Sequence, residues 1–231
     1  MRLDKFLGQL KYGSRNEIKK MVNQGLIFIN DTLCEKSDSK INPEYDKITI
    51  NGKVVFYKET VTLALYKPIG YLSANHDTMH KVLFELLKDP YNRFDFSIAG
   101  RLDLDSEGLI ILSTDGALIH QITHPKKHLN KVYEVLLDGK PKEEELSMLK
   151  NGVSIKDQHD AYYQATALSL TCQDETCLIT IDEGKFHQVK RMFKHIGFTV
   201  LNLKRISIGS LSLKALKPGE YSEINPEDIF L

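Results

Sequence analysis

The sequence predicts an α+β protein with two domains, a small N-terminal α/β domain (residues 1–58) and a larger domain (residues 59–231). In the first sixty residues, two short helical patterns precede two short apolar runs typical of strands. After the polar segment 52–60, strand-like runs and helical segments follow one another without a regular βαβ rhythm. This irregular order favours a largely antiparallel mixed sheet with flanking helices.

In the small domain, apolar residues at helical spacing predict two helices. The first ends near Gly13, and Ser14 and Glu17 form a capping box that begins the second. Gly25 suits the left-handed end of that second helix. Residues 26–29 and 47–50 read as strands. The apolar positions of the two helices are Leu3, Phe6, Leu7, Leu10, Ile18, Met21 and Val22.

The larger domain contains a more varied set of predicted elements. Apolar and β-branched runs predict strands at 61–66, 133–137, 178–181 and 205–213. Helical spacing predicts helices at 79–88 and 142–150, together with a loop that enters a helix at 185–195.

The bulk composition is that of a soluble globular protein. The chain has 231 residues, of which 42% are hydrophobic and 27% charged. No run approaches the roughly 20 apolar residues of a membrane span, and the charged N-terminus lacks the apolar block of a signal peptide. We therefore expect a cytoplasmic protein with no membrane partner.

Cysteine usage argues against a disulfide framework. There are three cysteines, and Cys34 is distant from Cys172 and Cys177. A zinc site at the latter two is disfavoured because no second ligand pair lies nearby. We expect these residues to be separate thiols.

The charge of the chain is balanced overall but unevenly distributed. Its formal net charge of zero argues against indiscriminate nucleic-acid binding. Nevertheless, residues 1–30 and 185–205 are both rich in Lys and Arg, and the second stretch contains no acidic residue. Four basic residues of the first stretch are expected to contact RNA phosphates instead of forming an ordinary solvated face. They are Arg2, Lys5, Arg15 and Lys19.

The segment GRLDLDSEGLIILSTDG (residues 100–116) carries acids at alternate positions before a buried-strand pattern. Asp103, Asp105 and Glu107 imitate the first half of a calcium loop, but the twelfth position, which requires a bidentate Glu, is Thr114. A solvated turn explains Asp105 and Glu107 but leaves the preceding Arg-Leu-Asp unexplained. A histidine cluster at 120, 124 and 128 is discounted as a metal site because Pro125 interrupts it, so no metal is expected.

This acidic segment resembles the central signature of pseudouridine synthases of the RsuA family. Further resemblances follow in the family's order: LYKPIGYLS (65–73), KVYEV (131–135), EGKFHQVKRMF (183–193) and LKPGEY (216–221). Residues 1 to about 50 resemble the small RNA-recognition domain first known from a small-subunit ribosomal protein. The resemblance implies a pseudouridine synthase fold in the larger domain, behind an RNA-binding domain of this S4 type.

The family reaction breaks the C–N glycosidic bond of a uridine, turns the base and rejoins it through carbon. This isomerisation needs no cofactor, and the sequence has no Walker loop or dinucleotide-binding glycine pattern. The resemblance identifies Asp103 as the catalytic carboxylate, acting either as nucleophile or as base. Burial in a uracil pocket would favour its neutral form, which a nearby cation opposes. Lys190 is expected to supply that cation, with Arg191 as the alternative.

The remaining site residues are assigned by the same resemblance. Tyr133 offers a flat ring for the uracil and a hydroxyl that can orient it or move a proton. Arg101 is expected to contact a phosphate or hold the Asp103 loop, and Arg191 to bind RNA if it does not pair with Asp103. His187 and Gln188 could equally bind RNA or cap a loop. Three residues are expected to shape the turn beside the site: Lys67, Pro68 and Gly70.

The expected partner is ribosomal RNA, and we expect the protein to act as a monomer. The RsuA resemblance favours 16S small-subunit RNA. Family branches that act on large-subunit RNA tend to carry other residues where Phe186, His187 and Gln188 stand here, which also favours 16S RNA. The alternative within the family is a synthase that acts on 23S large-subunit RNA. A non-catalytic ribosome-assembly factor is the rival from another class. It is disfavoured because a pure RNA binder has no use for a carboxylate facing an anionic polymer.

Overall fold

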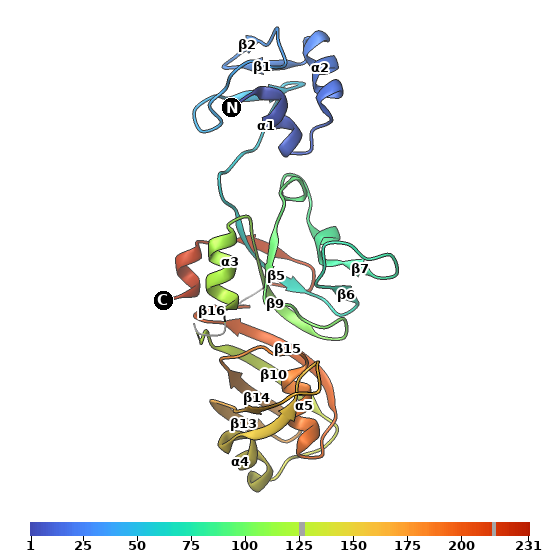
Figure 1. Ribbon diagram of the computed structural model, residues 1–231, viewed down its shortest axis with the longest axis vertical. Helices are drawn as coiled ribbons and strands as arrows, with labels where there is room; N and C mark the ends of the chain where they lie inside the picture. Colours follow the sequence, from blue (N-terminus) through green and yellow to red (C-terminus); the bar gives the residue numbers. More distant parts are fainter. Residues whose placement is uncertain (125–127, 214–215) are drawn as a thin grey trace. The chain divides into compact units, whose positions relative to one another are not determined.

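The computed structural model describes residues 1–124, 128–213 and 216–231, which form two compact units. The first comprises Met1–Val61 with Leu87–Phe96, and the second Thr62–Leu86 with Ser97–Leu231. Helices and sheets occur in both (Figure 1), so the predicted α+β class is confirmed.

Two helices and a four-stranded antiparallel sheet make up the first unit. Helix α1 (Leu3–Gln9) and helix α2 (Arg15–Asn23) confirm both predicted helices. The strands lie in the order β2-β1-β3-β4. Their bounds are β1 Ile27–Ile29, β2 Thr32–Leu33, β3 Ile48–Ile50 and β4 Lys53–Val54.

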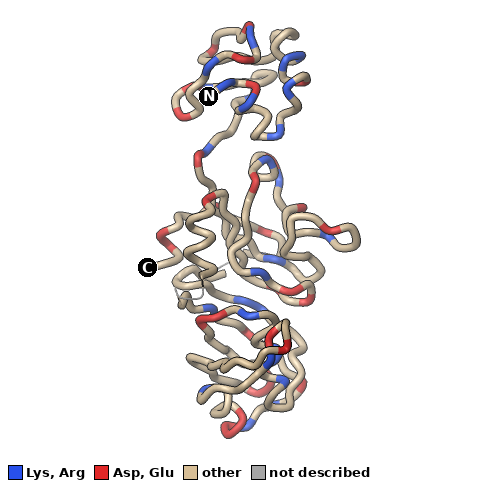
Figure 2. Tube along the Cα trace, in the orientation of Figure 1, with Lys and Arg blue, Asp and Glu red and all other residues tan. Residues whose placement is uncertain are grey.

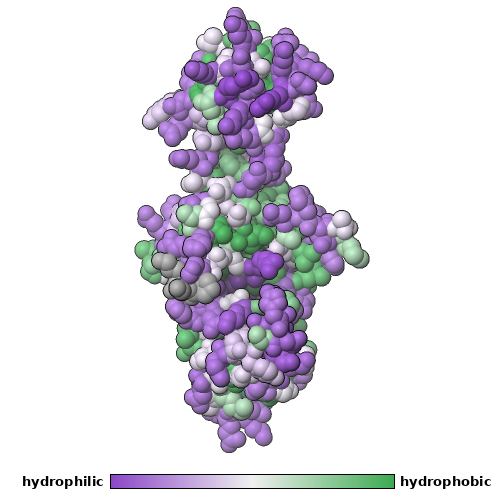
Figure 3. All heavy atoms as spheres, viewed as in Figure 1, coloured by the Kyte–Doolittle hydropathy of each residue, from purple (hydrophilic) through white to green (hydrophobic). Residues whose placement is uncertain are grey.

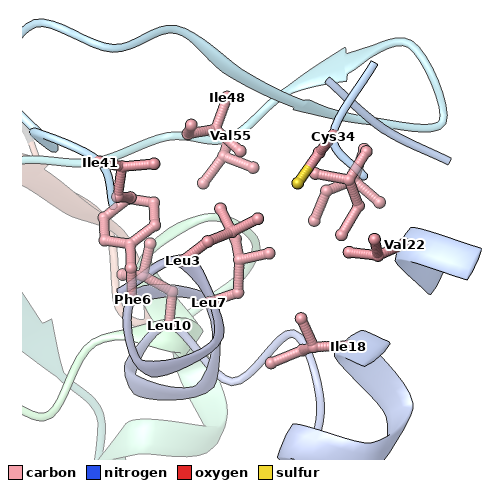
Figure 4. Close-up of a cluster of buried hydrophobic side chains, with 12 residues drawn as sticks. Leu3, Phe6, Leu7, Leu10, Ile18, Val22, Cys34, Ile41, Ile48 and Val55 are labelled. Atoms are coloured by element: carbon pink, nitrogen blue, oxygen red, sulfur yellow. The ribbon is translucent and has the colours of Figure 1, made fainter. Parts of the chain in front are cut away.

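The predicted capping box begins α2. The Ser14 amide donates to Glu17 Oε2 at 2.7 Å, and the Glu17 amide donates back to Ser14 Oγ at 3.4 Å. Gly25 follows the helix with a φ of +70°, as predicted. The apolar side chains of both helices then meet those of the strands in one core (Figure 4), whose members include Leu3, Phe6, Leu7, Leu10, Ile18, Val22, Ile27, Ile41, Ile48 and Val55.

The segment Leu87–Phe96 packs with the first unit, although the sequence analysis assigned it to the second domain. Its aromatic side chains explain this. The Phe56 ring lies edge-on to the rings of Tyr91 and Phe94, with centroids 5.8 and 5.9 Å apart. The Arg93 guanidinium lies 4.2 Å from the centre of the Tyr12 ring. These contacts between residues distant along the chain have no local signal in the sequence.

The second unit is organised around a mixed sheet of nine strands. Seven of them follow the order β13-β14-β10-β15-β9-β5-β17, while β8 pairs with β9 and β16 with β15. Within this sheet only β15 and β9 pair in parallel among the described residues, so the largely antiparallel prediction is confirmed. The bounds are β5 Thr62–Lys67, β8 Ser97–Ala99, β9 Glu107–Ser113, β10 Lys131–Leu137, β13 Ser169–Gln173, β14 Thr176–Ile181, β15 Val200–Ile208, β16 Leu211–Ser212 and β17 Tyr221–Glu223.

Helices and small strand pairs complete this unit (Figure 1). Helix α3 (Gly116–Thr123) shares a core with β5 and β9, while α4 (Glu143–Asn151) contacts β13 and α5 (Gln188–His195) contacts β15. Helices α4 and α5 confirm the predictions at 142–150 and 185–195. The remaining elements of this unit are β6 Tyr71–Leu72, β7 Lys81–Val82, β11 Val153–Lys156, β12 Tyr162–Ala165 and the 3₁₀ helices Leu83–Leu86 and Pro226–Ile229, while the 3₁₀ helix Tyr91–Arg93 belongs to the first unit.

Two secondary-structure predictions are wrong. Residues 79–88 form β7 and a 3₁₀ turn instead of an α-helix, because Asp77 Oδ1 accepts the Met79 and His80 amides and turns the chain there. Residues 205–213 are not one strand. They break at Gly209, whose amide donates to the Asn130 carbonyl at 2.7 Å, and β16 folds back onto β15.

The expectation of separate thiols at Cys172 and Cys177 is also wrong. The two residues lie directly opposite each other on β13 and β14 and form a disulfide. Because β13 and β14 are joined by a tight hairpin, two residues five positions apart in the sequence are paired across the strands. Cys34 remains a free, buried thiol.

The structure also bears on membrane spans, on metal sites and on the histidines near the end of α3. Among the described residues, no helix combines the length and apolar character needed to cross a bilayer. The same residues contain no group of three or more His, Cys, Asp or Glu arranged to hold a metal ion. Helix α3 ends at Thr123. Pro125, which was expected to interrupt a helix carrying the three histidines, lies outside the described residues.

Candidate active site

Asp103 lies on the loop that joins β8 to β9. Hydrogen bonds from the segment after β5, made by the Gly70 amide and the Ser73 hydroxyl, fix this loop. The Gly70 amide donates to the Leu104 carbonyl at 2.8 Å, and Ser73 Oγ donates to the Leu102 carbonyl at 2.8 Å. The Leu102 amide returns a hydrogen bond to the same hydroxyl at 3.1 Å. The turn expected to lie beside the site therefore holds the acidic loop directly.

Lys67 supports the loop from inside the protein. Its side chain is fully buried, and its Nζ donates to the Ser106 carbonyl at 2.6 Å and to the Pro68 carbonyl at 3.0 Å. Burial lowers the pKa of Lys67 to about 8, and the charges of Asp103, Asp105 and Glu107 oppose that decrease. The ammonium thus ties the end of the β5 strand to the end of the acidic loop.

Lys190, on α5, is the cation that faces Asp103. Its Nζ lies 3.0 Å from Asp103 Oδ2 and 2.6 Å from Asp105 Oδ1. Burial lowers the pKa of Lys190, but the hydrogen bonds and charges of the two carboxylates outweigh this and raise it overall. Arg191 points elsewhere, since its Nη1 donates to the Lys156 carbonyl. Of the two cations considered from the sequence, the structure pairs Lys190 with Asp103.

His187 contacts the other oxygen of the same carboxylate. Its Nε2 lies 3.2 Å from Asp103 Oδ1, and its ring stacks on Phe186 with centroids 3.7 Å apart. Gln188 is instead buried, and its Oε1 accepts the Lys185 amide at 3.0 Å. Of the two roles considered, Gln188 has the geometry of a loop cap, whereas His187 lies at Asp103.

Tyr133 is connected to the acidic loop through Arg205, a residue that the sequence analysis did not single out. The two residues are paired on β10 and β15, and Arg205 Nη1 donates to the Tyr133 hydroxyl at 3.4 Å. Arg205 is only 1% exposed. Its Nη2 donates to the Gly100 carbonyl at 2.6 Å and its Nε to the Leu109 carbonyl at 2.8 Å. The guanidinium therefore links both ends of the acidic loop to the tyrosine.

The packing beside Arg205 is tight. A Cβ on Gly108, whose φ is +112°, would lie 2.3 Å from the Arg205 carbonyl oxygen, so a side chain at this position would collide with the β15 backbone. Strand alternation places Arg205 on the same face as the buried Leu203. That alternation is the signal that distinguishes this buried arginine from its basic neighbours in the sequence.

Three buried cations lie in this part of the unit. Like Lys67 and Arg205, Lys131 is buried and donates to main-chain carbonyls, those of Leu129 at 2.7 Å and Asp182 at 3.4 Å. Burial, reinforced by the charge of Arg205, lowers the pKa of Lys131 to about 8. The charges of Arg205 and Asp103 also act on Lys67. These cations give the interior a positive potential that favours an anion at the site.

The predicted RNA-binding residues of the first unit lie on its surface. Lys5, Arg15 and Lys19 are exposed, and Figure 2 shows the basic positions along α2. Arg2 is instead engaged by Asp4, with Nη2 and Oδ2 2.7 Å apart. Figure 3 shows that hydrophilic side chains predominate on the visible face of this unit. Arg101, in the second unit, is exposed on the acidic loop.

The chain is similar to known proteins over its whole length. Residues 61–195 match the family described as RNA pseudouridylate synthase, and residues 1–47 match the S4 domain. A Bacillus subtilis protein named as the uncharacterised RNA pseudouridine synthase YtzG is 39% identical, covering 100% of this chain and 98% of its own.

Two further relatives are each 33% identical over 99% of this chain. One is the ribosomal small subunit pseudouridine synthase A of Vibrio vulnificus, 98% of which is covered. The other is the ribosomal large subunit pseudouridine synthase B of Bacillus subtilis, 93% of which is covered. A solved structure described as a pseudouridylate synthase superposes with a TM-score of 0.67 at 31% identity, covering 99% of this chain and 98% of its own. The chain therefore belongs to the RNA pseudouridylate synthase family, whose members are isomerases that act on RNA, and it carries an S4 domain ahead of the synthase domain.

Proposed function

We propose that this chain converts a specific uridine of 16S small-subunit ribosomal RNA into pseudouridine, with Asp103 initiating cleavage of the glycosidic bond. The observation that carries the proposal is the Asp103 carboxylate itself, held by Lys190 at 3.0 Å and by His187 at 3.2 Å. An ionised carboxylate can serve either as a nucleophile or as the base that begins glycal formation. Both routes use the same oxygen atoms.

The neighbouring cations suit the charge changes of this reaction. Breaking the C–N bond leaves negative charge on the departing uracil, which the positive potential of Arg205, Lys67 and Lys131 would stabilise. The Tyr133 hydroxyl accepts from Arg205, and no acceptor for its own proton is found in the described part of the chain. We propose that Tyr133 packs against the uracil and directs this proton toward it.

RNA must present the uridine outside a base stack. A stacked uridine does not expose its glycosidic carbon to a carboxylate, so the enzyme extrudes it, at a cost of a few kcal/mol, or meets it in a loop. We propose that phosphate contacts by the S4 domain contribute the binding energy for this step.

The choice of 16S RNA rests on the Phe186–His187–Gln188 sequence and on the small-subunit relative. The large-subunit relative is equally similar at 33% identity, which makes 23S RNA the second candidate substrate.

Pseudouridine and uridine have the same mass, so detection needs a chemical label. Carbodiimide labelling followed by primer extension on both RNAs, from cells with and without the gene, tests the proposal. We expect one stop in 16S RNA that disappears with the gene. Loss of a 23S stop instead would reassign the substrate, and identical stops would refute the activity.

Removing the charges of Arg15 and Lys19 together is expected to weaken RNA binding and flatten its salt dependence. For single-stranded RNA, each lost phosphate contact should reduce the slope of log K against log salt by about 0.7. Binding titrations at several salt concentrations measure this slope. Lys47→Ala is the matched control, because its Nζ pairs with Asp31 at 3.0 Å. A double variant whose slope equals that of the wild type would identify this face as ordinary solvated surface.

A further inference from the structure

The exposed face of α5 continues as a basic surface beyond Lys190. Helix α5 buries Gln188, Val189, Met192 and Phe193. At 3.6 residues per turn, the opposite face then presents Lys190, Arg191, Lys194 and His195 together. Lys190 is engaged by Asp103 and Asp105. The other members of this face lie further from the carboxylates and have no role in the proposed chemistry.

These other residues line a cavity of about 390 Å³ between α5 and the β11–β12 hairpin. The cavity is wide and open to solvent, as a site for one nucleotide of a longer strand would be. Arg191, Lys194 and His195 form the helix side, while Lys156 and Tyr162 are on the hairpin. Figure 1 shows α5 in orange in the second unit. The cavity therefore combines cations with an aromatic ring.

The Tyr162 ring is presented to solvent. The residue is 69% exposed, and Lys156 Nζ lies 5.5 Å from the ring centre. An exposed tyrosine beside cations is the combination with which proteins bind single-stranded RNA, because the ring stacks on a base while the cations contact the backbone.

Two carboxylates also line the cavity, and both are engaged within the protein. Asp157 Oδ1 accepts the His159 amide at 2.7 Å and the Ala161 amide at 3.0 Å. Asp160 Oδ1 lies 3.3 Å from Lys156 Nζ. Within the described chain, Arg191 and Lys194 have no carboxylate within ion-pair distance. The Nη1 of Arg191 donates to the Lys156 carbonyl, but the guanidinium has other N–H groups. These two cations are therefore the groups that an incoming phosphate would meet.

Contacts connect the cavity to Asp103. The His187 ring lies against Asp103 and stacks on Phe186. The Arg191 guanidinium carbon lies 5.1 Å from the centre of the Phe186 ring. Arg191 then forms part of the cavity wall. A strand of RNA whose uridine reaches Asp103 could thus extend along α5 toward Tyr162.

We propose that this cavity is a subsite for a nucleotide that flanks the target uridine, with its base stacked on Tyr162 and its phosphate between Arg191 and Lys194. The inference rests on the proposed function, because it assumes that an RNA strand lies at Asp103. It assigns to the β11–β12 hairpin a role in holding the strand beside the modified position, because stacking and phosphate contacts position RNA without reading its sequence.

The test uses a nine-nucleotide single-stranded RNA centred on a uridine, with one abasic ribose introduced at each flanking position in turn. Fluorescence anisotropy measures its affinity for the full-length protein. Tyr162→Ala should weaken binding by about tenfold, the scale of one lost stacking contact, whereas Tyr162→Phe should bind like the wild type. An abasic ribose at one particular position should weaken wild-type binding similarly but cause no further loss in Tyr162→Ala.

Lys194→Ala tests the phosphate contact. It should reduce the salt slope by about 0.7, while Lys140→Ala, whose Nζ pairs with Asp174 at 3.0 Å, should leave the slope unchanged. The subsite is refuted if Tyr162→Ala binds like the wild type, if the abasic and Tyr162 losses multiply at every position, or if the wild-type protein does not bind the probe.

Measurement of pseudouridine in ribosomal RNA separates this inference from the proposed function. Unmodified RNA together with a positive Tyr162 cycle would refute the function and leave an RNA-binding site. Modified RNA together with unchanged Tyr162→Ala affinity would refute the subsite alone.

Discussion

Replacing Asp103 with Asn should abolish pseudouridine formation while leaving RNA binding intact. The amide has nearly the shape of the carboxylate but can act neither as a nucleophile nor as a base. Losses on removing the reacting group of an enzyme reach roughly 10⁴-fold or more. We expect single-turnover assays on ribosomal RNA to show a decrease of at least that size, with a dissociation constant within a few-fold of the wild type.

Asp105→Asn is the matched control for this variant. Asp105 lies on the same loop and even closer to Lys190, with 2.6 Å between Oδ1 and Nζ, but its side chain is 73% exposed. Its carboxylate has no assigned part in the chemistry, so we expect turnover within about tenfold of the wild type, since an exposed ion pair contributes little. If Asp105→Asn lost activity and Asp103→Asn kept it, the reacting carboxylate would be Asp105.

Both variants should remain folded. Asp103 is partly exposed, at 28% of its side chain, and Lys190 retains one carboxylate in either case. Thermal unfolding should therefore show similar midpoints for the two variants and the wild type. A much lower midpoint for Asp103→Asn alone would mean that the residue acts in folding as well as in the reaction.

Local signals in the sequence were sufficient for much of the architecture. The Ser14–Glu17 capping box and the apolar spacing around it predicted α2, because these interactions connect residues within one turn. The continuous apolar run after Glu107 likewise predicted a buried strand, which the structure confirms as β9. In the synthase domain, three of the motifs, 65–73, 131–135 and 183–193, identified segments whose residues contact the Asp103 loop or are linked to it through Arg205.

Contacts between distant residues were not predictable in the same way. The packing of Phe94 with the first unit depends on rings contributed by residues about forty positions earlier. The Cys172–Cys177 disulfide depends on hairpin register, which a count of cysteines does not contain. Arg205 was missed for a related reason. In the sequence it is one basic residue among several, and the alternation that places it on the face of Leu203 becomes informative only once its pairing with Tyr133 and its burial are known.

Arg205 yields the second large expected effect. We expect Arg205→Met to reduce both stability and turnover strongly, because the carbonyls of Gly100 and Leu109 would lose their buried donors. Each such loss costs about 1–3 kcal/mol, and the melting temperature of a protein of this size falls by roughly 2–4 °C per kcal/mol. Arg205→Lys keeps the charge but loses the planar fork that reaches separate acceptors. It should therefore retain more stability than Arg205→Met but lose roughly 100-fold in kcat, the scale of a displaced positioning group.

A double-mutant cycle with Tyr133→Phe distinguishes positioning from simple structural support. If Arg205 acts through the Tyr133 hydroxyl, Arg205→Lys should reduce kcat much less in the Tyr133→Phe background than in the wild type. Lys204→Met is the control on the neighbouring position of β15, where the side chain is 28% exposed and lies 3.9 Å from Glu134. It should change kcat less than about threefold, since its long ion pair with Glu134 contributes little. If the losses in kcat caused by Arg205→Lys and Tyr133→Phe were independent, Arg205 would support the fold without positioning Tyr133. If Lys204→Met lowered kcat as much as Arg205→Lys, the loss would reflect a general sensitivity of β15 to substitution.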